Sequence, residues 1–396
     1  IQRDWFYDPE MHGVDWQAVF DKYQPLVAFC GNRSDLNYLI GEMIGELNIG
    51  HTYVFGGDYG DRAERVRVGL LGADFDTPDQ AAYHRIAHII PGLSWQSSSF
   101  ERSPLAAPGC GAENGDYLIA IDGEDVASTD NVFAYLEDKV GRAVTVSFND
   151  RPAADGASTC TVEPISSESA LRRREWVETN RAMVDRASGG TIGYLYLPAM
   201  MENGLVEFAR AFYPDYTKKA FIIDERYNGG GFVGDMIIDR LERELWAFSK
   251  PREGMVLRDP ERAFHGHLAV LVNEDTGSNG EYFAEAVKIK GLATVIGMRT
   301  WGGAVGIEPH QDLVDGGGTT PPQFGIFGFD GRWLIEGHGV DPDIEVQNEP
   351  GDVLAGRDSQ LEAALVHLAD RLASEPMAVP SSSPAFPVKA KESIAR

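Results

Sequence analysis

The second half of the chain alternates short apolar segments with amphipathic ones, and this alternation constrains the fold more than any other feature. Four segments from about residue 190 on have the composition of buried strands: TIGYLYLPA, KAFIIDERYN, LAVLVNED and LATVIGMRT. Segments with helical spacing of apolar residues lie between them: VEFARAFYP, FVGDMIIDRLERELWAF and EYFAEAVKIKG. Strands that alternate with helices predict a largely parallel sheet covered by helices, so we expect an α/β layer here.

Changes in composition predict three further parts. Residues 1–57 have helical spacing, whereas residues 64–165 contain short strand-like runs separated by Gly and Asn. The segment TDNVFAYLEDKVG within this β-rich module has the pattern of a short amphipathic helix, and residues 167–187 that of a polar connecting helix. We expect residues 166–375 to hold the α/β body and the Pro- and Ser-rich residues 376–396 to form a disordered tail.

Charge and cysteine content exclude several classes of protein. The 396 residues carry a net charge of −26, which disfavours nucleic acids and anionic membranes as partners. No apolar run approaches the roughly 18 residues that a membrane helix needs. Cys30, Cys110 and Cys160 are odd in number and lack CxxC spacing, so we expect free thiols rather than disulfides or a zinc site. The chain opens without Met, which indicates a piece of a longer protein and leaves localisation weakly determined.

The segment TGSNGEYFAEA, residues 276–286, places a serine at the start of a predicted helix. Ser278 with Glu281 three residues later has the pattern of a capping box. A serine at a helix N-terminus is also well placed as a nucleophile, because nearby backbone N–H groups and the helix dipole stabilise an oxyanion. One residue can serve both roles, and these eleven residues alone do not decide between them.

The segment IIDERYNGGGFVGD places three consecutive glycines between a strand and a helix. Gly229, Gly231 and Gly234 fit G-x-G-x-x-G, but this turn comes late in the domain and no acidic residue at a strand end follows about twenty residues on. Outward N–H groups at such a turn form an oxyanion hole as readily as a phosphate site. Nucleotide or acyl-CoA chemistry therefore stays open as a third interpretation, beside a purely structural turn.

A serine nucleophile needs a base, and the chain has nine histidines. His84 and His88 are four residues apart and could share a helix face, but no third metal ligand is evident, so we interpret them as structural. His51 follows Gly50 just after the second predicted helix, where a loop can project the imidazole into a cleft. Spacing alone makes His51 a candidate and no more.

Several longer motifs resemble the tricorn protease family and, more distantly, the C-terminal-processing serine peptidases. They are DPEMHGVDW, RSDLNYLIGEMIGELN followed by HTYV, DERYNGGG, TGSNGEYF and WLIEGHGVDPDIEV, in this order over residues 5–375. The resemblance implies a mixed α/β protein: a crotonase-like catalytic domain with a helical N-terminal part and an inserted PDZ-like domain.

The resemblance also implies site residues. Ser278 falls on the nucleophile of the family, His51 on its general base and Glu336 on its acidic residue. The NGGG turn, through Gly230 or Gly231, and the residue after the nucleophile, Asn279, fall on the donors of the oxyanion hole.

This chain departs from the family pattern at two positions, and the first of them bears on the orientation of the base. The family carries a serine directly before the histidine, where this chain has Gly50. The residue after the nucleophile is acidic in the family and Asn279 here, which matters little for a backbone donor. The C-terminal-processing peptidases use a lysine base in a stretch that resembles RTWGGAVG, where this chain has Gly302 and Gly303. We therefore expect the base to be histidine.

The segment GLLGADF, residues 69–75, resembles the carboxylate-binding loop of PDZ domains, with Gly69, Leu70, Leu71 and Gly72 as its core. A spacer or gating role for this module is an equally open interpretation.

The sequence predicts a serine peptidase acting on peptides, with no metal and no cofactor. The alternative is a peptide-binding scaffold of the same fold whose catalytic residues have decayed, beginning at Gly50. The resemblance further implies a cytoplasmic homo-oligomer with upstream β-propeller domains that lie outside this chain.

Overall fold

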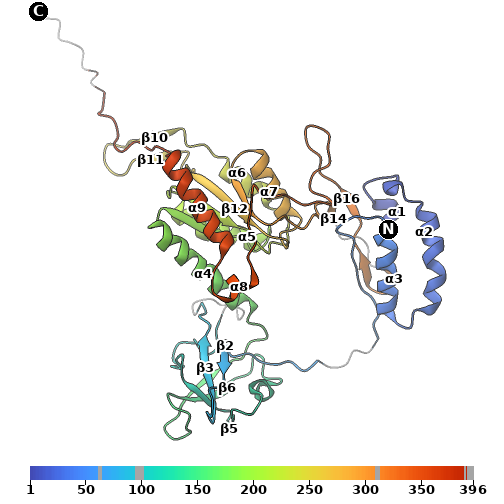
Figure 1. The fold of residues 1–396 in the computed structure, drawn as a ribbon, viewed down its shortest axis with the longest axis vertical. Helices are drawn as coiled ribbons and strands as arrows, with labels where there is room; N and C mark the ends of the chain where they lie inside the picture. The colour runs from blue at the N-terminus through green and yellow to red at the C-terminus, as the bar shows by residue number, and fades with distance from the viewer. Residues whose placement is uncertain (61–64, 94–101, 308–312, 388, 390–396) are drawn as a thin grey trace, which may run out of the picture. The chain divides into compact units, whose positions relative to one another are not determined.

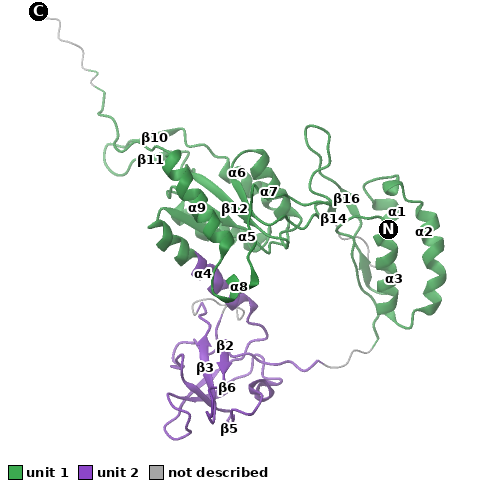
Figure 2. Cartoon of the chain, viewed as in Figure 1, with its two compact units in different colours: residues 1–60, 181–396 green, residues 61–180 purple. Residues whose placement is uncertain are grey.

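The computed structural model describes residues 1–60, 65–93, 102–307, 313–387 and 389. Contacts divide the chain into two compact units (Figure 2). Unit 1 joins residues 1–60 to residues 181–396, and unit 2 holds residues 61–180. The predicted β-rich module thus lies within unit 2, which is inserted between the two segments of unit 1.

The centre of unit 1 is a five-stranded sheet with the order β17-β13-β12-β9-β8, of which Figure 1 labels the middle strand, β12. Every neighbouring pair in it is parallel. The strands are β8 (Ile192–Tyr196), β9 (Ala220–Asp224), β12 (His267–Val272), β13 (Thr294–Gly297) and β17 (Ile344–Glu345). β8, β9 and β12 are buried throughout, as expected for a sheet covered on both faces. The predicted α/β layer is confirmed.

Helices cover this sheet. Phe221 and Ile223 of β9 share a core cluster with residues of α5 (Glu202–Asp215), α6 (Gly234–Leu241) and α7 (Asn279–Ile289). The C-terminal helix α9 (Ser359–Ser374) packs against β9, β12 and β13. α4 (Ser169–Ser188) connects the units, and α8 (Pro350–Leu354) precedes α9.

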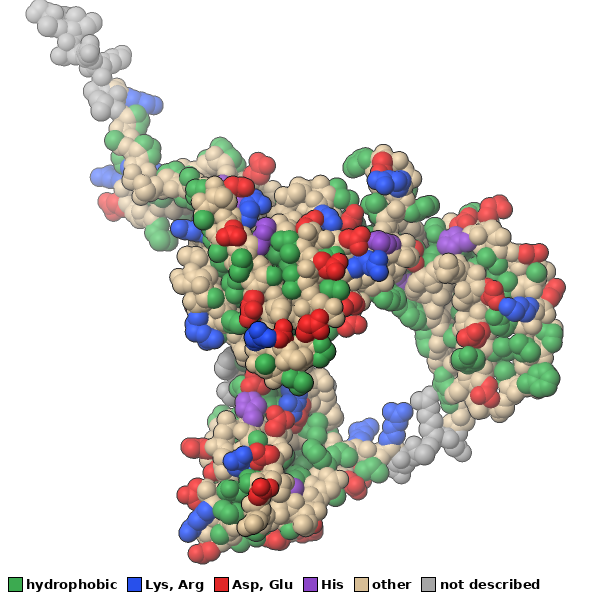
Figure 3. Space-filling model, in the orientation of Figure 1, with side chains coloured by type: hydrophobic (Ala, Val, Ile, Leu, Met, Phe, Trp, Pro, Cys, Tyr) green, Lys and Arg blue, Asp and Glu red, His purple; other side chains and the backbone are tan. Residues whose placement is uncertain are grey.

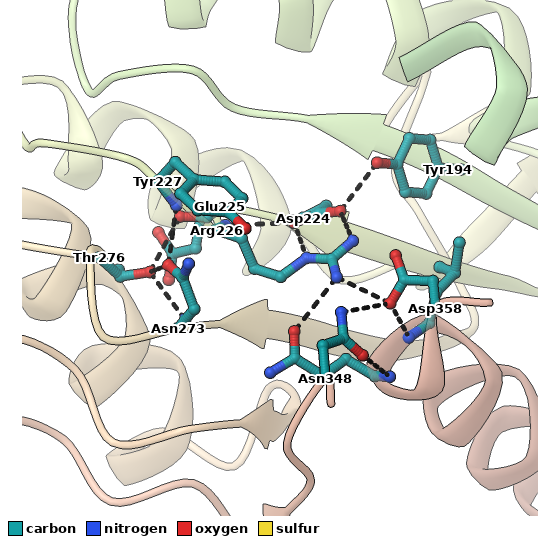
Figure 4. A network of polar contacts seen from close by, with 11 residues as sticks. Tyr194, Asp224, Glu225, Arg226, Tyr227, Asn273, Thr276, Asn348 and Asp358 are labelled. Carbon is teal, nitrogen blue, oxygen red and sulfur yellow. Dashed lines mark hydrogen bonds and ion pairs between the residues drawn. The ribbon is translucent and has the colours of Figure 1, made fainter. Parts of the chain in front are cut away.

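A buried ion-pair network fastens α9 to the end of β9 (Figure 4). Asp224 Oδ2 accepts hydrogen bonds from Arg226 Nη2 at 2.7 Å and from Tyr194 Oη at 2.8 Å. Arg226 Nη1 donates to Asp358 Oδ1 at 2.8 Å, and Asp358 is the N-cap of α9. This network holds the turn that follows β9.

The N-terminal part of unit 1 contains three α-helices. They are α1 (Gln2–Trp5), α2 (Trp16–Tyr23) and α3 (Arg33–Gly45), with 3₁₀ turns η1 (Met11–Gly13) and η2 (Gln24–Phe29) between them. The Asp15 and Asn32 side chains cap α2 and α3 by accepting hydrogen bonds from Ala18 N and Asp35 N.

Short strands join this part to residues near the end of the chain. β1 (Val54–Gly56) pairs antiparallel with β15 (Gly317–Thr319), while β14 (Gly306–Ile307) and β16 (Pro322–Phe324) pair with each other in the second segment of unit 1. Gln2 Nε2 donates to Thr319 Oγ1 and Thr320 O, both at 3.2 Å. Segments more than 250 residues apart in sequence are thereby brought side by side.

The helix expected over FVGDMIIDRLERELWAF is shorter than predicted. α6 ends at Leu241, and β10 (Ala247–Ser249) forms a hairpin with β11 (Leu257–Asp259). Helical spacing of apolar residues continued past the true end of the helix, and the tertiary context decided the boundary.

Unit 2 is an antiparallel sheet in the order β2-β3-β4-β6-β7, with β5 (Glu124–Asp125) beside β4. Its other strands are β2 (Ala73–Asp76), β3 (His84–Ile89), β4 (Tyr117–Ile121), β6 (Val144–Asn149) and β7 (Ser158–Val162). The short helix predicted over TDNVFAYLEDKVG is the 3₁₀ helix η4 (Val132–Leu136).

Two expectations for this unit were wrong. Cys110 and Cys160 form a disulfide with an S–S distance of 2.10 Å, and Cys30 is free. Both paired cysteines lie in the core of unit 2, so folding brings together residues that are 50 positions apart. His84 and His88 lie on strand β3 rather than on a helix. The His88 ring contacts Glu175 Oε1 at 2.6 Å, and the His84 ring contacts Thr77 Oγ1 and Asp130 O.

Acidic side chains are spread over the visible surface of both units, in keeping with the net charge (Figure 3). None of the described helices combines the length and the apolarity required for a bilayer. Of the predicted tail, residues 376–387 contain no helix or strand, and Lys250 Nζ donates to Pro384 O at 2.7 Å. Residues 388 and 390–396 lie outside the described residues.

Candidate active site

Ser278 is the N-cap of α7, at the sharp turn that leads from β12 into the helix. Its φ of 56° and ψ of −122° lie in a region that residues with a Cβ rarely adopt. The predicted capping box with Glu281 is present, and Glu281 Oε2 accepts a hydrogen bond from Ser278 N at 2.9 Å. The turn therefore holds Ser278 in a strained, fixed conformation.

The glycine turn lies directly against Ser278. Gly230 has a φ of 93°, and a Cβ at this position would lie 2.5 Å from Ser278 Cβ and 2.8 Å from Asn279 N. Both the conformation and the close approach require glycine.

The two predicted glycine donors differ in availability. Gly230 N already donates to Asn228 Oδ1 at 2.9 Å. Among the residues that the structure describes, the N–H groups of Gly231 and Asn279 have no hydrogen-bond partner. The geometry therefore favours Gly231 together with Asn279 as oxyanion donors.

The Asn279 side chain has a structural role of its own. Its Oδ1 accepts a hydrogen bond from Gly234 N, the first residue of α6, at 2.9 Å. An amide oxygen at this helix start satisfies one of the N–H groups that have no partner within the helix. Asn279 thus connects α6 to α7 while its own N–H remains available.

His51, Ser278, Gly231 and Asn279 all line one cavity of about 670 Å³ in unit 1. Aromatic and aliphatic side chains form much of its wall. The lining residues are His51, Tyr53, Gly229, Gly231, Phe232, Asp235, Ser278, Asn279, Tyr282, Ala304, Gly306, Ile307, Phe324 and Ile326.

His51 is buried, with 8% of its surface exposed, and has a φ of 56°. Its ring packs edge-on against Trp301, with the ring centroids 5.2 Å apart. Its carbonyl oxygen accepts a hydrogen bond from Thr320 Oγ1 at 2.8 Å. Burial lowers the pKa of the His51 imidazole, and the nearby Glu336 carboxylate acts in the opposite direction. The neutral imidazole, the form that accepts a proton, is therefore favoured.

The two nitrogens of His51 differ in their surroundings. Nδ1 is buried and has no hydrogen-bond partner among the described residues. This leaves Nε2 as the nitrogen that can face the cavity. Ser278 and His51 line the same cavity, but no hydrogen bond joins them within the described part of the chain; catalytic hydrogen bonds often form fully only when a substrate binds.

Glu336 lies beside His51 but bonds to backbone rather than to the ring. Its Oε1 accepts from Gly50 N at 2.8 Å, and its Oε2 accepts from Ala304 N and Val305 N at 2.8 and 2.9 Å. A Cβ at Gly50 would lie 3.1 Å from Glu336 Oε1. Glu336 thus fixes the backbone that carries His51.

Four consecutive N–H groups in residues 302–305 are bound by two carboxylates. Gly302 and Gly303 donate to Glu281, whereas Ala304 and Val305 donate to Glu336. The sequence has no lysine in this loop. Through Glu281 and Glu336, the loop is connected both to the helix that follows Ser278 and to the loop of His51.

Sequence reasoning identified Glu281 as a helix cap but missed its second role, and it missed Trp301. The spacing S-x-x-E signalled the cap, whereas nothing in the local sequence indicated contacts with residues about twenty positions on. Trp301 N donates to Thr276 O at 3.0 Å, so its ring is held between the two loops.

In unit 2, residues 69–72 form the loop that resembles a PDZ carboxylate-binding loop, and most of its N–H groups already donate hydrogen bonds within the chain. Gly69 N donates to Leu136 O at 2.9 Å and Leu70 N to Ile165 O at 2.8 Å. Gly72 N donates to the Glu168 carboxylate at 3.0 Å. A carboxylate of the chain itself therefore occupies one of the donors that the sequence suggested for a ligand.

Three protein-family models match this chain. Residues 191–346 match peptidase family S41, residues 69–167 the tricorn protease PDZ domain, and residues 1–45 the tricorn protease C1 domain. The chain belongs to the tricorn protease family, which confirms the resemblance and the mixed α/β fold with an inserted PDZ domain.

Individual relatives agree. Tricorn protease homolog 1 of Streptomyces coelicolor is 35% identical over 97% of this chain and 35% of its own length. The tricorn protease of Thermoplasma acidophilum is 34% identical over 94% of this chain and 34% of its own length. A crystal structure of the tricorn protease matches with a TM-score of 0.85 at 33% identity, covering 94% of this chain and 36% of that chain. The chain spans about a third of the length of these relatives.

Proposed function

We propose that this chain is the catalytic region of a serine peptidase that hydrolyses peptides, with Ser278 as nucleophile and His51 as general base. One observation carries the proposal: a serine in a strained turn, near two backbone N–H groups that have no partner among the described residues, borders the same cavity as a buried histidine. Membership of the tricorn protease family supports it.

Acylation follows from this arrangement. Ser278 Oγ attacks the carbonyl carbon of the scissile peptide bond while its proton passes to His51 Nε2. The N–H groups of Gly231 and Asn279 stabilise the negative oxygen of the tetrahedral intermediate. Collapse of the intermediate breaks the C–N bond, and the leaving amine takes the proton from His51.

Deacylation repeats the same steps with water. His51 removes a proton from a water molecule that attacks the acyl-enzyme, and the proton then returns to Ser278 Oγ. Glu336 contributes through the backbone of Gly50, by holding the His51 loop in place, and through its charge, which stabilises the imidazolium that forms.

One observation favours the alternative, a peptide-binding scaffold with a decayed site. His51 Nδ1 is buried without a partner among the described residues, and Gly50 offers no side chain to orient the ring. In the triad mechanism a hydrogen bond at Nδ1 fixes the tautomer that leaves Nε2 free to accept.

Covalent labelling tests the proposal. The chain is treated with a fluorophosphonate, followed by intact mass measurement and peptide mapping. A single adduct on Ser278, absent in Ser278→Ala, is the expected result. A folded wild-type protein that takes up no label, both as this chain and with the upstream domains of a full-length protein, would favour the scaffold.

The proposal extends to peptide substrates, a homo-oligomer, upstream β-propeller domains and a cytoplasmic location. The propeller domains accord with the share of the relatives that this chain spans. The oligomer and the location rest on family membership alone.

A further inference from the structure

Glu225 is a fully buried carboxyl group that the proposed mechanism does not use. It follows β9 directly, is 0% exposed, and neither carboxyl oxygen has a hydrogen-bond partner among the described residues. Its neighbours Asp224 and Arg226 are both bound in the ion-pair network (Figure 4). An ionised carboxylate in such surroundings is very costly, so the neutral acid is the form that fits.

The backbone of Glu225 is attached to the segment that precedes the nucleophile. Glu225 O accepts a hydrogen bond from Thr276 Oγ1 at 3.1 Å. Three residues on, Asn228 O accepts one from Gly277 N at 2.8 Å. The turn 225–228 and the turn that carries Ser278 therefore move as one piece.

The side chain of Glu225 belongs to the face of the sheet on which α7 lies. Phe221 and Ile223 share a core cluster with Phe283 and Ala284 of α7, and Glu225, directly after β9, follows them in the same alternation. Glu281, in the first turn of α7, is also 0% exposed. Burial, followed by the charges of Asp224 and Glu281, raises the pKa of Glu225 well above its ordinary value.

The two buried carboxyl groups differ in their partners. Glu281 accepts hydrogen bonds from Ser278 N, Gly303 N and Thr300 Oγ1 at 2.7 to 2.9 Å, and from Gly302 N. Glu225 accepts none within the described chain. The charged groups near it are Asp224, Glu281 and Arg226, and the Arg226 guanidinium is taken up by Asp224 and Asp358.

We propose that Glu225 is a proton-dependent positioning residue: as the neutral acid it supports the turn of Ser278, and its ionisation disorders that turn. Loss of the proton places an uncompensated negative charge opposite Glu281, which fixes Ser278 N and the 302–303 backbone. Movement of residues 276–281, which include Ser278, would separate the two negative charges and reduce their repulsion. The effect on Ser278 reactivity rests on the proposed peptidase function, whereas the effect on the turn does not.

Hydrogen–deuterium exchange of peptides covering residues 276–284 tests the structural part. Wild type and E225Q are compared at pH 6, 7, 8 and 9, and the wild-type to E225Q rate ratio cancels the chemical pH dependence of exchange. The folded pKa of Glu225 lies above its unfolded value, so its stabilising contribution is full below about pH 4.5 and declines as pH rises. We expect the ratio to rise with pH, by no more than about tenfold per unit, because one proton is involved.

E362Q, which removes an exposed carboxylate from α9, serves as the control and should exchange as wild type does. A ratio that does not change with pH, or an equal change in E362Q, overturns the proposal. If E225Q does not fold, E225M provides a neutral side chain of similar length.

Labelling of Ser278 by a fluorophosphonate at the same pH values tests the link to reactivity. The expected result is a wild-type rate that falls relative to E225Q as the exchange ratio rises. A pH-dependent exchange ratio with an unchanged ratio of labelling rates overturns the positioning role. If neither protein reacts at any pH, the proposed peptidase function fails, and the exchange ratio alone still decides whether Glu225 controls the turn.

Discussion

The Glu336 carboxylate accepts a hydrogen bond from Gly50 N at 2.8 Å, across 286 positions of sequence. Since its other oxygen binds Ala304 N and Val305 N, one side chain fixes the His51 loop to the 302–305 loop. Glu336 thus holds the backbone next to His51, at a point where a Cβ on residue 50 would lie 3.1 Å from Glu336 Oε1.

Glu336→Gln should weaken both the fold and the site. A glutamine keeps one acceptor oxygen and turns an NH₂ group toward backbone donors, so at least one N–H loses its partner. We expect a loss of about 1–3 kcal/mol in the free energy of unfolding and slower labelling of Ser278. Urea unfolding and labelling rates measure the two effects. Glu345→Gln, at an exposed position, is the control, and an equal loss in both variants would argue against this role.

Gly230→Ala should abolish the reactivity of Ser278. The new Cβ would lie 2.5 Å from Ser278 Cβ in a backbone conformation that favours glycine. We expect a loss of labelling of at least about 10²-fold, because the oxyanion donors are displaced. Gly45→Ala, which meets nothing within 4 Å, controls for a general effect of removing a glycine. A Gly230→Ala protein that labels at the wild-type rate would contradict the assigned geometry.

The acid limb of the pH–rate profile should have its midpoint below 6.5. The base must be neutral to accept a proton, and burial lowers the pKa of His51 from this value. Because the folded pKa lies below the unfolded one, the contribution of His51 to stability is full above about pH 6.5 and is lost as pH falls through the folded pKa. Labelling rates between pH 4.5 and 8 give the midpoint, and one at or above 6.5 would count against His51 as the base.

Arg226→Met should be strongly destabilising. It leaves Asp224, which is 0% exposed, without its counter-charge. Removing one partner of a buried pair typically costs about 3–5 kcal/mol. Arg332→Met breaks an exposed pair with Asp330 and should cost about 1 kcal/mol or less. Denaturant unfolding of the two variants should therefore differ clearly, and similar midpoints would refute a structural role for the network.

Glu168→Ala should increase the affinity of unit 2 for the C-terminal carboxylate of a peptide. The Glu168 side chain is 11% exposed and occupies the N–H of Gly72. We expect about tenfold tighter binding of a fluorescein-labelled peptide with a free C-terminus, measured by fluorescence polarisation. The same peptide with an amidated C-terminus is the control. Equal affinity of wild type and Glu168→Ala would show that Glu168 does not block this loop.

The sequence predicted β8, β9, β12 and β13 of the parallel sheet because these strands are apolar and bounded by turn residues, whereas the two-residue strand β17 was not predicted. Strands of two or three residues, such as β1 and β14, were not predicted, because their pairing depends on partners far along the chain. The Cys110–Cys160 disulfide was not predicted for the same reason, because the two cysteines are 50 positions apart in the sequence.

Ser278 was found from its local spacing and its cap. His51 was a candidate from its position after a predicted helix, its role and that of Glu336 were assigned through the resemblance, and both catalytic roles remain predictions. The local sequence gives no sign that Glu336 binds Gly50 N or that Glu225 is buried without a partner. Such features arise from contacts between loops that the chain brings together only when it is folded.

Unit 2 interrupts unit 1, which has a consequence for synthesis. His51 leaves the ribosome in the first segment, and the serine and the glutamate that complete the site follow only after all of unit 2. β1 cannot pair with β15 until residues 317–319 have been made. The contacts of Glu336 with Gly50 N and of β15 with β1 therefore form only after residues 317–336 have been made, so a product that ends before them lacks an assembled candidate site.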